Sequence, residues 1–217
     1  MRHALLLALK DSFSPYVLGF IVKITLLSGM LTGVVLWLTG GLIKSYVQSY
    51  LGMLPWEWLQ SFGAGAAVVA IGYMLFILIL SVSASLMIEP VLKRLAKKHY
   101  GITPVGSPSL SRSLLISLKT GAVFFLLFLF TFPLMFVPVL GAVYMLYLWS
   151  VPIKEPSVYD VSAMFRTPPP PAKRATLMAM AAAAFNYIPL LNAFTPVFAE
   201  IVFMHDALSV RKSSENF

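Results

Sequence analysis

The sequence predicts an all-α integral membrane protein that forms a single membrane domain, residues 1–217. Hydrophobic residues make up 59% of the chain and charged residues 11%, far below the roughly 25% charge of soluble domains. The charged residues leave four long neutral stretches, residues 24–43, 58–88, 120–153 and 175–199. Because about 20 apolar residues in a helix cross the hydrocarbon core, each stretch is a candidate membrane segment.

Residues 1–14 are expected to form a short amphipathic lead-in, since Leu5, Leu6 and Leu9 share one helical face. Lys10, Ser12 and Ser14, together with the free N–H groups where the next helix begins, favour binding of a sulfate-sized oxyanion. Asp11 in the same segment opposes an anion. Plain N-capping by Ser14 is the alternative that needs no ligand.

The first long transmembrane helix is predicted over residues 16–43. A serine followed by Pro15 is typical of an N-cap and the first helical position. Inside the helix, Gly29 and Gly33 form a GxxxG pair, which lets a second helix approach closely.

The second long helix is predicted over residues 59–100, with a cytoplasmic extension. Pro90 is expected to kink it, because proline removes a backbone donor. Beyond the kink, residues 91–99 place apolar and basic side chains on opposite faces, and Gly101 is expected to end the helix.

Two helical hairpins are predicted after this helix, over residues 114–153 and 172–210. Residues 136–142 match residues 187–193 position by position: aromatic, β-branched, proline, aliphatic, leucine, turn-former, alanine. Each set is expected to reverse the chain, because proline interrupts a helix and Gly or Asn tolerates a left-handed backbone. The predicted reversal residues are Pro138, Gly141, Pro189 and Asn192.

The arms of these hairpins are short. Residues 120–137, 142–153 and 175–188 contain 18, 12 and 14 residues, and most of these fall short of the roughly 20 that a crossing needs. The prediction is therefore two long transmembrane helices and two re-entrant hairpins that only partly penetrate the bilayer.

The basic residues predict the orientation. Apart from Lys23 and Lys44, they fall in four islands, residues 2–10, 93–119, 154–174 and 211–212. These islands share one face if the chain turns back after each neutral stretch. The positive-inside rule makes that face cytoplasmic, with both termini inside. The basic residues that give the net charge of +8 then set the topology and lie near anionic lipid headgroups. No nucleic-acid partner is expected.

The search for catalytic chemistry is negative. The absence of cysteine excludes disulfides and thiol chemistry. The sequence has no HExxH, GxSxG, P-loop or EF-hand pattern. The three histidines, His3, His99 and His205, are far apart in the sequence. We therefore expect no enzyme, no cofactor and no metal.

Two charged residues stand inside predicted membrane segments. Glu200 is flanked by apolar residues, and a buried acid there is either paired structurally or handles ions. Lys23 either extends to the near interface or pairs with Glu200. A Glu200–His205 pair is rejected, because five residues along a helix rotate the two side chains about 140° apart.

The chain resembles the family of CysZ sulfate permeases and etoposide-induced membrane proteins. The resemblance is carried by Ser14-Pro15, Glu89-Pro90, residues 136–142, residues 159–161 (Tyr-Asp-Val) and residues 187–193. It implies two long transmembrane helices with two partly penetrating hairpins, assembled into a homo-oligomer. It also implies sulfate import across the inner membrane of a bacterium.

One position departs from the family pattern. The bacterial permeases carry a Gly-Leu-Arg motif before the first long helix, where this chain has Ala8-Leu9-Lys10. Lysine keeps the positive charge but loses the two-pronged guanidinium that suits oxyanions.

The sequence thus favours a permease or channel for a small inorganic anion, with sulfate as the first candidate. The alternative is a non-transporting membrane scaffold. Its basic cytoplasmic helix (residues 91–99) and proline run (residues 167–171) would recruit partners or anionic lipid.

Overall fold

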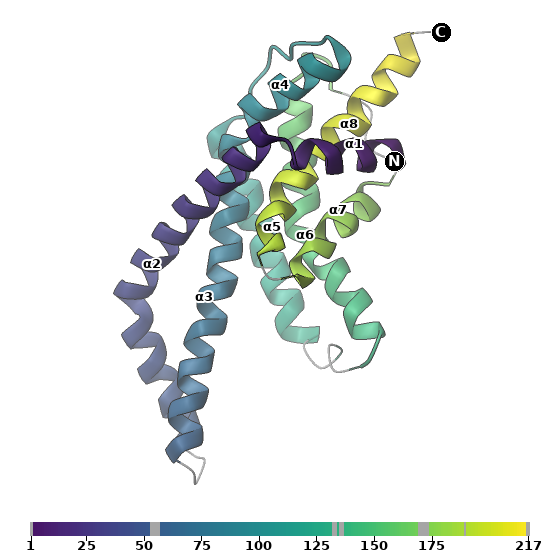
Figure 1. The fold of residues 1–217 in the computed structure, drawn as a ribbon. Coiled ribbons are helices and arrows are strands. Elements are labelled where there is room, and N and C mark those ends of the chain that lie inside the picture. Colours follow the sequence, from purple (N-terminus) through teal and green to yellow (C-terminus); the bar gives the residue numbers. More distant parts are fainter. Residues whose placement is uncertain are drawn as a thin grey trace. The chain divides into compact units, whose positions relative to one another are not determined.

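The computed structural model describes residues 2–52, 57–131, 134, 137–168, 174–188 and 190–215. Every regular element in these ranges is a helix, which confirms the all-α class (Figure 1). The chain divides into two compact units. One contains Met1–Val22 and Ser81–Phe217, and the other contains Lys23–Leu80.

The unit formed by Lys23–Leu80 consists of most of α2 (Pro15–Leu51) and α3 (Glu57–Met87). Helix α2 begins at Pro15 as predicted and continues eight residues beyond the predicted end at residue 43. The close approach of the two helices falls at Gly72, where an added Cβ would lie 2.8 Å from Leu36. A Cβ at Gly29 or Gly33 would meet no described atom within 4 Å, so this pair makes no close helix contact with the described residues of the chain.

Within the described ranges, four helical segments are long and apolar enough to cross a membrane: Pro15–Ser49, Gln60–Met87, Leu110–Phe128 and Leu191–Val210. The first three are mainly exposed: in the 18-residue apolar stretch of each, 22%, 12% and 17% is buried. In the last segment, 72% of that stretch is buried. Exposed apolar helices suit a lipid environment. The last segment is instead the central helix of its own unit.

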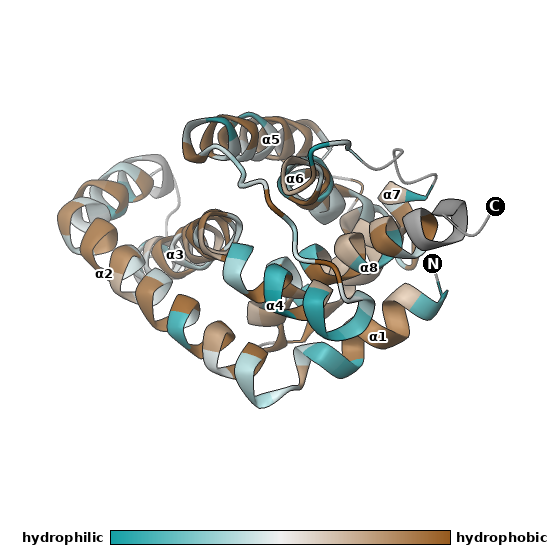
Figure 2. Cartoon of the chain, turned by 90° about the horizontal axis from the view of Figure 1, so that it is seen from above, coloured by the Kyte–Doolittle hydropathy of each residue, from teal (hydrophilic) through white to brown (hydrophobic). Residues whose placement is uncertain are grey.

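The second long helix is interrupted near Pro90 as predicted, and another helix follows it. The cytoplasmic position of that helix stays a prediction. Helix α3 stops at Met87, and α4 (Glu89–Tyr100) begins directly before Pro90. Helix α4 ends at Gly101, whose φ of 68° is left-handed and whose N–H donates to the carbonyl of Lys97. The apolar face of α4 is buried. Much of the rest of this helix is hydrophilic, as the teal colour in Figure 2 shows.

The C-terminal half contains two helix–reversal–helix segments. Helices α5 (Leu110–Thr131) and α6 (Leu140–Ala163) pack on each other. Then follow α7 (Ala175–Ala183), η2 (Ala184–Tyr187), η3 (Leu191–Phe194) and α8 (Thr195–Glu215). Helix α8 contacts α1 (Arg2–Ser12), α4, α6 and α7 (Figure 1).

The first hairpin's arms are longer than predicted. Helix α5 begins ten residues before the predicted start of its arm at residue 120. Helix α6 runs ten residues past the predicted end at residue 153 and contains both Pro152 and Pro156. The prediction ended that arm at the first charged residue. The structure shows that the helix continues through the prolines, with Asp160 near its end.

The two reversals turn at a different residue from the one predicted. The left-handed residues are Val139, with φ 64°, and Leu190, with φ 72°. Gly141 and Asn192 are helical and buried, so the predicted left-handed turn at them is wrong. The carbonyl of Pro138 accepts the N–H of Leu140 at 2.7 Å, which closes a γ-turn around Val139.

Both left-handed residues directly follow a proline and occupy equivalent positions in the two matched motifs. The likeness of these motifs therefore extends to the backbone. Pro189 itself lies outside the described residues, so its predicted role stays a prediction.

Candidate functional site

The predicted anion-binding residues lie together where α1 meets α2, in the unit that contains both termini. Lys10 is exposed and Ser14 is half-buried. Ser12 is buried, and its hydroxyl has no hydrogen-bond partner among the residues that the structure describes. The N–H of Ser14 donates to the carbonyl of Asp11 at 2.9 Å, and the carbonyl of Ser14 accepts from Leu18. Anion binding by these three residues stays a prediction.

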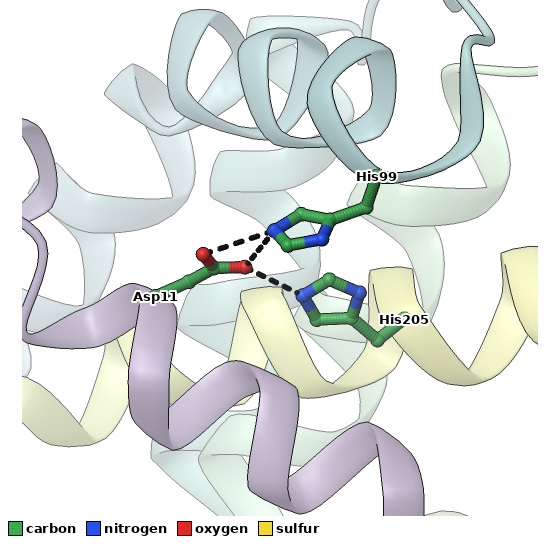
Figure 3. Close-up of side chains that lie close together, drawn as sticks. All are labelled: Asp11, His99 and His205. Atoms are coloured by element: carbon green, nitrogen blue, oxygen red, sulfur yellow. Dashed lines mark hydrogen bonds and ion pairs between the residues drawn. The ribbon is translucent and has the colours of Figure 1, made fainter.

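The neighbouring Asp11 is the centre of a polar cluster that joins three helices (Figure 3). Its side chain is buried and receives three partners. His99 Nε2 on α4 lies 2.8 Å from Oδ2, and His205 Nε2 on α8 lies 3.1 Å from the same oxygen. Lys98 Nζ lies 3.0 Å from Oδ1. The structure thus brings together two of the histidines that are far apart in the sequence.

Electrostatics keep Asp11 ionised. Burial raises the pKa of this carboxyl, but hydrogen bonds from His99, Lys98 and His205 and the charge of His99 lower it by more. The resulting pKa lies below the ordinary value for an aspartic acid.

Tyr100 completes the cluster. Its hydroxyl lies 3.0 Å from His205 Nδ1 and donates to the His205 carbonyl at 3.3 Å. Burial, together with the negative charges of Asp11 and Asp206, raises the pKa of Tyr100, so it remains a neutral phenol. The cluster therefore combines one carboxylate, two imidazoles, an ammonium and a phenol, a set that can hold a proton, an anion or a metal ion.

Sequence reasoning missed this cluster because His99 and His205 lie 88 and 194 residues from Asp11 along the chain. No local spacing indicates such a contact. One available signal is Asp11 itself, the single acid in a short helix that otherwise carries apolar and basic residues.

A second buried acid, Asp160 on α6, lies in the same unit. Ser113 donates to its Oδ1 at 2.7 Å, and Ser85 donates to its other oxygen. Burial raises the pKa of Asp160, and the two serine hydrogen bonds only partly oppose the rise. The Tyr-Asp-Val sequence at 159–161 was part of the family resemblance, so a signal for this residue was present.

Glu200 is buried on α8, and within the described part of the chain its Oε2 has no hydrogen-bond partner. Lys23 is exposed and belongs to the Lys23–Leu80 unit. The pairing of Lys23 with Glu200 stays a prediction. The His205 ring contacts Asp11 and Tyr100.

The long apolar helices define a multi-pass membrane protein. A family model described as sulfate transporter CysZ/etoposide-induced protein 2.4 matches residues 4–196. The chain therefore belongs to this family, whose description names a transporter rather than an enzyme. No curated protein and no solved structure matches the chain.

Proposed function

We propose that the protein is a permease or channel for a small inorganic anion, with sulfate as the first candidate. The observation that carries this proposal is the family match over residues 4–196, which includes the α1–α2 junction and both reversals. The helices that are long and apolar enough to cross a membrane support it.

The proposed arrangement has α2 and α3 crossing the bilayer, while α5–α6 and α7–α8 enter from the cytoplasmic side and turn back. The short arm of the second hairpin supports this arrangement. Its apolar helix, Ala175–Tyr187, has 13 residues and is about 20 Å long, which is less than the ~30 Å hydrocarbon core. Helix α5, helix α6 with its 24 residues and the η3–α8 segment are each long enough to cross. The support for re-entrant hairpins therefore comes from the 13-residue arm.

Contacts between the two hairpins support a joint role. The Tyr187 hydroxyl donates to the carbonyl of Ala142, just after the first reversal. The ring of Tyr187 also meets Trp149 edge-on, with centroids 5.0 Å apart. Because lipid cannot satisfy exposed backbone groups, reversals at membrane depth need such partners within the protein.

The proposed setting is the inner membrane of a bacterium, with both termini in the cytoplasm. The exposed basic side chains of α4 (Arg94, Lys97 and Lys98) support this orientation. We also propose a homo-oligomer. Gly29 and Gly33 have open space around them, and an apolar groove on α3 includes the small residues Gly65 and Ala66.

Uptake of labelled sulfate into proteoliposomes tests the proposed function. Protein that runs as a single species and retains its helical circular dichroism should admit sulfate faster than empty vesicles, and excess unlabelled sulfate should compete. Lys10→Gln should slow uptake, whereas the matched variant Lys44→Gln, at the far end of α2, should not. A rate equal to that of empty vesicles would remove the proposal.

The exposed basic side chains of α4 also favour a second candidate, a scaffold that binds anionic lipid or protein partners without transport. Deleting residues 167–171 would then abolish partner capture and leave solute flux unchanged. Residues 169–171 lie outside the described part of the chain.

A further inference from the structure

We propose that Asp11, His99 and His205 form a binding site for a divalent transition metal ion of the Zn²⁺ type. One ligand atom from each residue lies within 4.8 Å of the other two. Figure 3 shows both imidazole rings directed at the carboxylate from separate helices, α4 and α8. This goes beyond anion transport and differs from the expectation, drawn from the sequence, that the chain binds no metal.

The donor set selects the class of metal. Two imidazole nitrogens and one carboxylate oxygen suit Zn²⁺ and its first-row neighbours, whereas Mg²⁺ and Ca²⁺ prefer oxygen ligands alone. Three protein ligands also leave the fourth tetrahedral position to water or a solute.

The distances fit after a small adjustment. Asp11 Oδ2 lies 2.8 Å from His99 Nε2 and 3.1 Å from His205 Nε2. Ligand atoms about 2.0–2.1 Å from a tetrahedral ion are roughly 3.3 Å apart. The two carboxylate–imidazole distances are therefore within about half an ångström of the tetrahedral spacing, and the ligand atoms of the two histidines lie within 4.8 Å of each other.

Tyr100 supplies the outer contact that a metal-bound histidine requires. Such a histidine donates its second ring N–H to an acceptor, which fixes the tautomer. The Tyr100 hydroxyl oxygen lies 3.0 Å from His205 Nδ1, and the same hydroxyl donates to the His205 carbonyl at 3.3 Å. In this arrangement Nδ1–H donates to Tyr100, and the Nε2 lone pair faces the metal.

Lys98 competes with the metal. Its ammonium lies 3.0 Å from Asp11 Oδ1, the carboxylate oxygen farther from His205, and its side chain is 55% exposed. The lysine can swing into water when a cation binds at Oδ2, but its positive charge opposes that cation. His99 is 21% exposed at its side chain, which gives the ion a route to the otherwise buried site.

A bound ion would join α1, α4 and α8, three helices brought together only by folding. Because a ligand that binds the folded state alone raises its stability, the metal should hold the lead-in helix against the centre of its unit. That consequence is measurable without any transport assay.

The test uses full-length protein in detergent, stripped of metal with EDTA and titrated with Zn²⁺ by calorimetry. We expect one ion per chain and a higher unfolding temperature with Zn²⁺. His99→Gln keeps a donor for Asp11 but cannot bind zinc, and it should weaken binding about 10- to 100-fold. The matched variant His3→Gln, at the exposed histidine of α1, should leave binding unchanged.

Lys98→Gln separates a metal site from a simple hydrogen-bonded cluster. Removing the competing charge should tighten Zn²⁺ binding several-fold. The proposal is overturned if wild-type protein shows no stoichiometric binding, if His99→Gln binds as wild type does, or if Lys98→Gln weakens binding. None of these outcomes depends on whether the protein transports sulfate.

Discussion

Removing the Asp11 carboxylate is expected to destabilise the protein by about 3 kcal/mol. The cost arises mainly at His205, which is fully buried and would lose its carboxylate partner in Asp11→Ala. Burial lowers the pKa of His205 to about 4, so its ring is neutral and the bond that is lost is a hydrogen bond to a charged group. Such a bond contributes about 1.5–3 kcal/mol. Lys98 and His99 are partly exposed and can recover water, so each adds at most about 1 kcal/mol.

The assay is unfolding by SDS in mixed micelles, followed by tryptophan fluorescence in the presence of EDTA so that no metal contributes. Glu155→Ala removes an exposed acid from α6 and is expected to change the free energy of unfolding by less than about 0.5 kcal/mol. If Asp11→Ala is as stable as Glu155→Ala, the carboxylate does not hold the three helices together.

The pH dependence follows from the same residue. Because the folded-state pKa of Asp11 lies below its ordinary value, its contribution is present above the ordinary pKa and is lost as pH falls through the folded one. Asp11→Ala should show a flatter loss of stability in acid. An unchanged acid profile would contradict the assignment.

Three further changes test other parts of the fold. Val139→Gly should relieve the strain of the left-handed backbone and stabilise the protein by about 1 kcal/mol. The control Val143→Gly, in the middle of a regular helix, should instead destabilise it by roughly 0.5 kcal/mol. If unfolding in SDS shows that both variants are destabilised, the left-handed turn at Val139 is contradicted. Gly106→Ala should cost about 2 kcal/mol, because the new Cβ would lie 2.3 Å from the Ala163 carbonyl oxygen; an unchanged midpoint would refute that contact. Burial raises the folded-state pKa of Asp160, so wild-type stability should fall as pH rises from the ordinary value to the raised one. Asp160→Asn should flatten that fall, and an identical slope would show that the residue is not buried.

The helices themselves were predictable because their signals are local. Pro15 begins α2, Gly101 ends α4, and the apolar face of α4 is buried as its spacing predicts. The matched motifs also located both reversals. The turn residue was missed because glycine and asparagine tolerate left-handed backbone best, yet the strain falls on Val139 and Leu190, each directly after a proline.

The polar sites were less predictable because they depend on tertiary contacts. Asp11, His99 and His205 come from helices that are remote in sequence, and their meeting depends on how α1 and α4 pack on α8. Asp160 was visible only as part of the family resemblance. Its partners, Ser85 and Ser113, belong to two other helices that no spacing connects to it.

The transport account depends most on the two hairpins entering the bilayer without crossing it. Their tips are suitable for labelling, since Val139 and Leu190 are 79% and 86% exposed and the chain has no native cysteine. A membrane-impermeant maleimide added outside intact cells should label Ser49→Cys, near the end of α2, and should spare Val139→Cys and Leu190→Cys. Lys97→Cys on α4 should react only after the cells are permeabilised. Labelling of both tips as readily as Ser49→Cys would show that all four arms cross the membrane and would contradict the account.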